Sequence, residues 1–423
     1  MIAPPIGPTT TALVLFALAF QAPGARPRTA TAPPPVEVPS AAATEPTLLR
    51  LALRDATPAA AAAALVLASG GRVEVQPMGL PEPMQGGPTG RVTIDGTRPI
   101  PLWEAIDRIT AATGYQRSDV GPGIVGQNRP RIQLHGPIVR TKPGPAAYVG
   151  PFRFGAVTMS EVDARIYLKS PRTGPGDPED GHAFFAAFPV ATEPGVASIR
   201  LGPSRLVEAI DDRGRSLLPP PAVAASVGES NTVDQDLVTV RLPLARPQPA
   251  DPAVDDRPNR RLASLQGVIP VEVARRPIEP AESLPIEGLA GRTIRAGDLS
   301  VAVLEAGTKA PGMGVSIRFR LKIDGPRGFD PRPGPEALRL ANARLWAAAH
   351  HQVELVDSLG RSLLLGGGGG PDGAGPMTFQ YTCSFIPRAN GEGGEAPRAL
   401  LKVYPLAWTT WEVPFAFRDL PLP

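Results

Sequence analysis

The sequence predicts an α+β protein that is mainly β, in which a small βαββαβ module precedes two tandem antiparallel β-sandwich modules. Three observations predict this class. Proline and glycine number 54 and 45 of 423 residues, and both disfavour long helices. Several stretches alternate apolar and polar residues with a period of two, as strands with one buried face do. A 13-residue element also occurs twice, at 206–218 and 352–364, which indicates a duplicated module.

The N-terminal region has the features of an export signal. Residues 12–20 are all apolar, a run that is too short to span a bilayer and is typical of a signal-peptide core. No Lys or Arg precedes the run, so residues 1–25 are read either as a cleaved signal peptide or as a retained N-terminal anchor. Residues 26–46 are rich in Pro, Ala and Thr, and we expect a disordered, solvated linker there.

Residues 47–140 are expected to form the βαββαβ module. Helix-starting and helix-ending residues flank two apolar segments, with proline at each start and glycine after each end. The expected elements are a strand at 48–53, a helix capped by Thr57, opened by Pro58 and ended by Gly70, strands at 72–76 and 91–95, a helix opened by Pro101 and ended by Gly114, and a strand at 131–134.

Two half-repeats in this module carry a family resemblance. Each has a strand, a proline-opened helix and a glycine stop, and the second has Val92-Thr93-Ile94, Leu102, Ala105-Ile106 and Gly114-Tyr115. In these residues the segment 47–117 resembles the secretin and TonB short N-terminal domain. The resemblance implies a location in the cell envelope and contacts with other proteins, and it brings no catalytic residues. No secretin core follows the segment, so the resemblance does not extend to a channel.

From residue 148 onward the patterns are all-β and predict two immunoglobulin-like sandwich repeats, at 148–285 and 286–423. The two copies of the repeated element agree at eight of thirteen positions. Strands at 315–323 and 377–385 alternate apolar with polar residues, so each presents one face to a core. A helix at 336–349 is expected to cross between strands.

The repeated element contains the most distinctive motif, D-x-x-G-R-S-L-L. Its residues are Asp211, Gly214 and Arg215 in the first copy and Asp357, Gly360 and Arg361 in the second. They could form a binding site, or a tight turn in which Asp accepts backbone N–H groups and Gly adopts a positive φ. The turn is favoured, because the duplicate preserves the turn residues together with their apolar flanks.

No catalytic residues, cofactor or metal site is predicted. The glycine-rich run 366–375 is expected to be a hairpin loop, since it lacks the lysine of a phosphate-binding loop. The acidic segment 177–182 lacks EF-hand spacing and is read as a solvated loop. His350 and His351 would point to opposite faces of a strand, which argues against zinc. Cys383, the single cysteine, is expected to be a buried small hydrophobe.

Two tryptophans are the candidates for ligand contact. Trp408 and Trp411 would lie on opposite faces of a strand, so one is expected at the surface, where it could stack on a sugar ring. Glu104 and Asp107, three residues apart on the second expected helix, are read as a solvated face.

These features favour an exported, non-enzymatic envelope protein, periplasmic or extracellular, that binds another envelope protein or acts as a structural scaffold. A formal charge of +3 with scattered arginines gives no nucleic-acid footprint. Beyond a retained anchor, no membrane span is expected. One alternative is a cell-surface accessory protein that binds or processes polysaccharide. A second alternative is a hydrolase whose site residues are dispersed along the chain.

Overall fold

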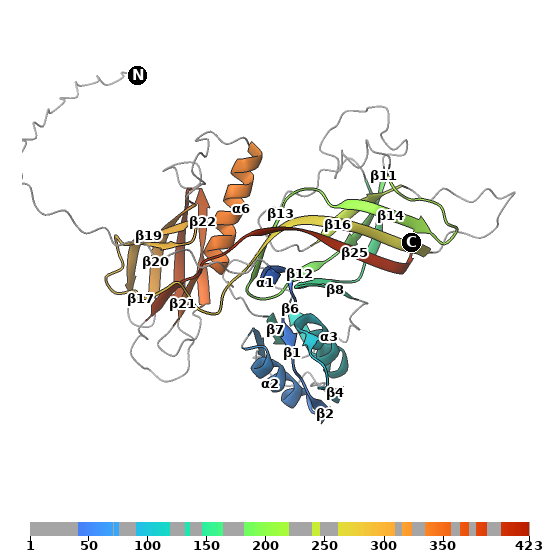
Figure 1. Cartoon of the computed structure of the whole chain (residues 1–423), viewed down its shortest axis with the longest axis horizontal. Helices are drawn as coiled ribbons and strands as arrows, with labels where there is room; N and C mark the ends of the chain where they lie inside the picture. The colour runs from blue at the N-terminus through green and yellow to red at the C-terminus, as the bar shows by residue number, and fades with distance from the viewer. Residues whose placement is uncertain are drawn as a thin grey trace, which may run out of the picture. The chain divides into compact units, whose positions relative to one another are not determined.

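Antiparallel strands dominate the computed structural model, which is mainly β (Figure 1). It describes residues 41–70, 72–75, 90–118, 132–135, 146–163, 182–219, 239–245, 261–308, 315–323, 335–356, 364–371, 378–386 and 399–422. These residues all belong to one unit, Glu37–Pro423. None of the helices in the described ranges combines the length and the apolar character that crossing a membrane requires.

The N-terminal module, which we define as the described residues from Thr47 to His135, has the predicted helices. Its elements are β1 (Leu48–Leu49), β2 (Leu53–Ala56), α2 (Pro58–Ala68), β3 (Val73–Val75), β4 (Val92–Ile94), β5 (Ile100–Pro101), α3 (Leu102–Thr113), β6 (Gln116–Ser118) and β7 (Ile132–His135). The Thr57 hydroxyl accepts a hydrogen bond from Ala60 N, and Gly114 ends α3 with a φ of 76°. Pro101 is the N-cap residue of α3, so it lies immediately before the first helical residue, Leu102.

One small core holds this module together. β3 pairs in parallel with β7, and β6 pairs antiparallel with β7, while β1–β5 and β2–β4 form two short antiparallel pairs. Leu65 of α2 and Ile106 of α3 are fully buried together with Leu134 of β7. Both helices therefore pack onto the three-stranded sheet through apolar side chains.

The first β body consists of two short sheets and one long one. Its strands are β8 (Ala147–Val149), β9 (Phe152–Phe154), β10 (Thr158–Asp163), β11 (His182–Phe188), β12 (Val190–Thr192), β13 (Val196–Arg200), β14 (Arg205–Asp211), β15 (Val240–Leu244), β16 (Arg261–Arg275) and β25 (Thr409–Pro421). The short sheets have the strand orders β10-β11-β15 and β12-β9-β8. In the long sheet, β16 pairs with β13, β14 and β25. All three sheets contribute to one core that includes Phe152, Phe188 and Leu262.

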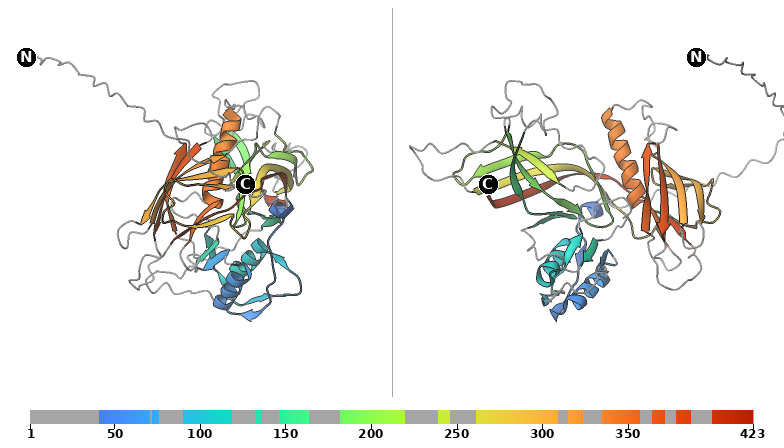
Figure 2. Two further views of the ribbon diagram at one scale, coloured as in Figure 1. Left: turned by 60° about the vertical axis from the view of Figure 1, so that its left-hand side comes forward. Right: turned by 180° about the vertical axis from the view of Figure 1, so that it is seen from behind.

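The last strand of the chain corrects a predicted boundary. β25 pairs with β16 from Thr409 opposite Val273 to Pro421 opposite Arg261, and the two strands run side by side (Figures 1 and 2). Val413 and Phe415 lie in the core of the first β body. The predicted module 286–423 is therefore wrong at its C-terminal end. Alternating residues identify a strand but do not specify which sheet it joins, and here the partner lies about 150 residues earlier.

The predicted linker 26–46 also needs correction at its end. Residues Ala41–Thr44 form the short helix α1, and Ala43 is buried against the first β body. The contact of Ala43 shows that this end of the linker is not fully solvated as expected. The preceding part of the linker and residues 1–25 lie outside the described residues.

The second β body is built around helix α6 (Pro335–His351). Its strands are β17 (Glu282–Pro285), β18 (Thr293–Ala296), β19 (Leu299–Thr308), β20 (Val315–Ile323), β21 (Val353–Val356), β22 (Leu364–Pro371), β23 (Thr378–Ile386) and β24 (Leu400–Val403). The sheet orders are β17-β24-β21 and β18-β19-β20-β23-β22. Both sheets share a core that includes Val301, Phe319 and Leu401, with Leu345 of α6 packed among them.

Helix α6 confirms the predicted helix and extends it through both histidines, whereas the glycine run differs from its prediction. Gly366–Gly370 belong to β22 and pair with Ser384–Gln380 of β23, so they form a strand and not a hairpin loop. Glycine can adopt the extended conformation, and here the run pairs through its backbone with the antiparallel strand β23. The remainder of the predicted loop, 372–375, lies outside the described residues.

Candidate functional site: polar junctions between the modules

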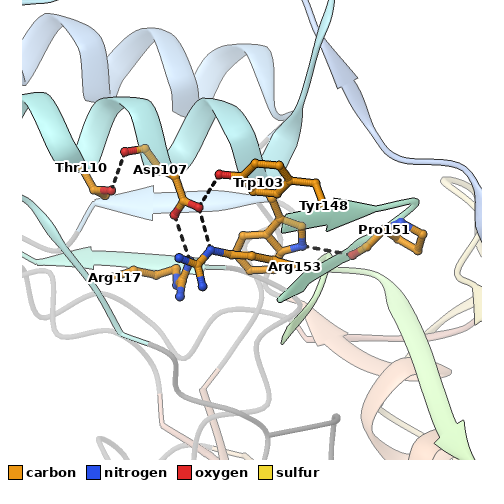
Figure 3. Close-up of polar contacts among 7 residues, drawn as sticks. All are labelled: Trp103, Asp107, Thr110, Arg117, Tyr148, Pro151 and Arg153. Carbon is orange, nitrogen blue, oxygen red and sulfur yellow. Dashed lines mark hydrogen bonds and ion pairs between the residues drawn. The ribbon is translucent and has the colours of Figure 1, made fainter. Parts of the chain in front are cut away.

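The most elaborate polar cluster joins the N-terminal module to the first β body (Figure 3). Asp107, on α3, accepts hydrogen bonds through Oδ2 from the Tyr148 hydroxyl and from Arg153 Nε, both at 2.7 Å. Its Oδ1 accepts from Arg117 Nη1 at 3.3 Å. Tyr148 and Arg153 lie on β8 and β9, so one carboxylate receives donors from both parts. We call this cluster the Asp107 junction.

The indole of Trp103 adds a second contact across the same junction. Its Nε1 donates to the Pro151 carbonyl at 3.0 Å, and the ring is buried. The Arg117 guanidinium lies 5.1 Å from the centre of that ring, within the range of a cation–π contact. Burial and the hydrogen bond to Asp107 raise the pKa of Tyr148, which keeps its hydroxyl protonated as a donor.

These contacts make the Asp107 junction a structural connection. The Asp107 carboxylate is engaged by two guanidinium groups and a phenol, so its lone pairs face donors and not an open site. The sequence-based interpretation of Asp107 as part of a solvated face is wrong, because its side chain is only 13 % exposed. Glu104, one turn earlier, does lie at the surface and pairs with Arg108.

A second carboxylate, Glu193, fastens the segment that enters the N-terminal module. Both Glu193 oxygens accept from Thr47 N, at 2.9 and 3.0 Å, and the side chain is fully buried. The Thr47 hydroxyl accepts from Arg72 Nη1 at 3.1 Å and from Arg275 Nη1 at 3.0 Å. Arg275 also lies 3.5 Å from Glu193 and donates to the Glu45 carbonyl. We call this cluster the Glu193 junction.

The charges of the Glu193 junction act against a strong desolvation effect. Burial raises the pKa of Glu193, although the Thr47 hydrogen bonds and the charges of Arg275 and Arg72 oppose that rise. Burial also lowers the pKa of Arg72, and the neighbouring charge of Arg275 adds to the effect. The cluster thus holds two arginines close together around one carboxylate.

A third contact region joins the two β bodies through α6. Ala343, Ala347 and Leu406 pack against Ala197 and Ile199 of the first β body. Glu272 of β16 binds Arg344 of α6 with two hydrogen bonds, at 2.9 and 2.7 Å. We call this region the α6 joint. It combines a small apolar contact with one bidentate ion pair.

The repeated motif has the geometry of a turn where the structure describes it. Asp211 Oδ1 accepts from Arg213 N at 3.0 Å and from Arg215 N at 2.8 Å, while Oδ2 accepts from Arg215 Nε at 2.9 Å. Gly214 has a φ of 79°. Burial works to raise the pKa of Asp211, but the hydrogen bonds from Arg215 and Arg213 lower it on balance. The second copy, Asp357, Gly360 and Arg361, lies outside the described residues.

The tryptophans do not match the expectation of an exposed ring. Trp411 packs on the core of the first β body, with its ring centre 5.7 Å from that of Phe152. Trp408 lies just before β25 and packs on the apolar part of the α6 joint. Each tryptophan is half-buried, and the two lie in different contacts. The predicted alternation of faces does not apply to them, because β25 begins only after Trp408.

Of the other candidate residues, the structure corrects the prediction for the two histidines, and it does not describe the side chains of the rest. His350 and His351 lie at the end of α6 and not in a strand. Cys383 lies in β23 opposite Gly367, and its side chain is outside the described part. The same holds for the acidic residues of the 177–182 loop. Within the described ranges, no three His, Cys, Asp or Glu side chains are grouped so that they could hold a metal ion.

Sequence reasoning missed Arg153 and Glu193 as junction residues. A usable signal exists for the first: Arg153 stands between Phe152 and Phe154 in a strand whose three residues are all buried. An arginine in an apolar strand needs a buried acceptor. Glu193 offers no comparable signal, since its partner is a backbone N–H 146 residues away in sequence.

Comparison of the chain with family models, with curated proteins and with solved structures gives no match. The functional argument therefore depends on the junctions and on the sequence.

Proposed function

We propose that the protein is an exported, non-enzymatic envelope protein whose modules form a scaffold that binds another envelope protein. The observation that carries this proposal is the Asp107 junction, in which the charged groups of two modules bind one another. Such a satisfied network fixes the orientation of the N-terminal module and leaves little capacity for acid–base chemistry there. A fixed orientation is useful to a scaffold, because it presents surfaces at a constant spacing.

Export and the envelope location are supported by sequence alone. The apolar run at 12–20 is typical of a signal-peptide core. The resemblance of 47–117 to the secretin and TonB short N-terminal domain points to the same compartment and to protein partners. The element order of the N-terminal module, with two helices between strands, is compatible with that resemblance.

We further propose that the two β bodies are immunoglobulin-like sandwiches that arose by duplication. The repeated sequence element supports this, and its two copies begin at antiparallel strands, β14 and β21. An experimentally determined structure of the full chain would test the proposal, since superposed repeats should align β14 with β21. Unrelated strand orders around these two strands would argue against duplication.

The carbohydrate alternative receives less support from the geometry. Both stacking candidates, Trp408 and Trp411, are engaged in packing between elements of this chain. A glycan would have to compete with those contacts, so the scaffold is the favoured reading.

Two experiments test the proposal in sequence. Cell fractionation should place the protein outside the cytoplasm, and recovery in the cytoplasm would contradict export. In-cell crosslinking should then join the full chain to an envelope protein, and the Arg153→Ala variant should lose that crosslink because its module is no longer fixed. The matched control is Arg205→Ala, which breaks only an exposed ion pair with Glu412. Equal crosslinking by both variants would contradict a scaffold that depends on module orientation.

A further inference from the structure

The C-terminal end of α6 is the point at which the chain crosses between the two β bodies. The first crossing starts at Arg276, whose N–H donates to the Gly195 carbonyl of the first body at 2.7 Å. The second starts at Tyr404, whose N–H donates to the carbonyl of Gln352, the residue after α6, at 2.8 Å. Gln352 Nε2 also donates to the Tyr404 carbonyl at 3.1 Å. The second crossing therefore begins beside the last turn of the helix, and Arg276 of the first crossing faces His351 of that turn.

Two histidines occupy this last turn. His351 follows Ala347 by four residues and Arg344 by seven, so it continues the stripe of α6 that faces the first β body. The Trp346 and His350 rings are 4.5 Å apart between centres. His350 Nε2 and His351 Nδ1 are closed off from solvent, although each residue keeps part of its surface exposed.

The groups around the pair are mostly cationic or already engaged. Arg276 faces His351 from the first crossing, and each histidine faces the other. Glu354 lies 3.3 Å from Arg276 and accepts from the Tyr404 hydroxyl at 2.8 Å. Arg344, two turns earlier on α6, is neutralised by Glu272. A proton placed on His351 therefore meets the charge of Arg276, and His350 is opposed by His351, while the nearby carboxylate already has two donors.

We propose that His350 and His351 make the α6 joint a proton-sensitive joint, which is closed at neutral pH and opens in mild acid while both β bodies remain folded. Opening lets water reach the protonated rings, which hydrates their charge. The joint is suited to this change because its apolar cluster, with six buried residues of which four are alanine, is small beside the cores of the two bodies. The core of the first body lies elsewhere, whereas Trp346, the ring partner of His350, packs against the core of the second body.

The titration behaviour of the pair agrees with this direction. Burial, and then the charge of His351, lowers the pKa of His350 to about 3, and burial together with Arg276 lowers the pKa of His351 to about 4. A freely solvated histidine titrates near 6.5. The closed joint therefore binds protons more weakly than an open one, and its stability falls as pH drops below about 6.5.

Small-angle X-ray scattering of the full chain between pH 7 and pH 4.5 tests the proposal. We expect the radius of gyration to rise as the pH falls, with far-UV circular dichroism unchanged. The double variant His350→Gln, His351→Gln should keep the neutral-pH radius over the whole range. The matched control, His135→Gln with His182→Gln, removes the other two histidines and should open like the wild type.

Each other outcome contradicts the proposal. A wild-type radius that stays constant to pH 4.5 overturns it, and so does opening of the double variant at the same pH. Loss of circular dichroism in step with the expansion would mean general unfolding. If the double variant does not fold, Arg276→Gln provides the test, because removal of the opposing cation should shift opening to lower pH. An unchanged or higher opening pH in that variant would refute the proposal.

Discussion

The junctions at the N-terminal module and the α6 joint solve the same problem with different chemistry. The Asp107 and Glu193 junctions each surround a carboxylate with arginine, hydroxyl or backbone donors from both sides of the contact. The α6 joint instead buries a small apolar cluster of alanine, leucine and isoleucine and uses one ion pair. Carboxylate clusters are directional and fix an orientation, whereas an apolar contact is not directional. Under the two proposals above, this difference keeps the N-terminal module fixed and lets the β bodies move.

The largest effect is expected from Arg153→Ala, which would break the Asp107 junction. Removing one partner of a buried ion pair leaves the other charge uncompensated and costs about 3–5 kcal/mol. Arg153 and Asp107 are both nearly buried, but Arg117 and the Tyr148 hydroxyl still contact Asp107 in the variant, so we expect a loss of about 3 kcal/mol, at the lower end of that range. Urea denaturation should show the loss, with faster proteolysis of the N-terminal module.

The exposed pair of Arg205 and Glu412 supplies the control. Both side chains are more than half exposed, and such pairs contribute about 0–1 kcal/mol. A loss from Arg153→Ala no larger than that from Arg205→Ala would show that the Asp107 junction does not fix the module.

The α6 joint should respond less to loss of its ion pair. Arg344→Leu removes two charged hydrogen bonds from Glu272, but the Arg344 side chain is 29 % exposed, so this pair is more open to solvent on the arginine side than the pair of Arg153 and Asp107. We expect a loss of about 1–2 kcal/mol. Urea denaturation of the full chain measures it, with Arg108→Leu on the surface of α3 as a control of equal size. If Arg344→Leu lowered the free energy of unfolding more than Arg153→Ala, the Asp107 junction would not be the stronger of the two contacts.

The same contrast explains how much could be predicted from sequence. Helix ends at Thr57 and Gly114 depend on neighbouring residues, and the alternating pattern of β20 depends on a period of two, so both could be predicted. The pairing of β25 with β16 could not, because hydrogen bonds between backbones are indifferent to side-chain sequence. The sequence places Asp107 wrongly on a solvated face and gives no sign of Glu193 for a related reason. Their partners are distant in sequence, and a carboxylate on a helix or in a loop is usually solvated.

The smallest effect, and the most specific, is the pH dependence that Glu193 contributes. Burial raises its pKa in the folded protein above the ordinary value of 4.5. The folded protein therefore holds that proton more tightly than the unfolded chain. The contribution is most favourable below the unfolded pKa, and it declines as pH rises through the folded pKa.

Glu193→Gln removes this titration while keeping an acceptor for Thr47 N. The free energy of unfolding of the wild type should therefore fall, relative to the variant, between pH 4 and pH 7. Urea denaturation of both chains at several pH values measures the difference, and the histidines cancel because both chains contain them. A wild type that gains stability relative to the variant over this range would mean that the charge of Arg275 outweighs desolvation. The Glu193 junction would then be a stabilising ion pair, and its chemistry would differ more clearly from the mainly apolar contact of the α6 joint.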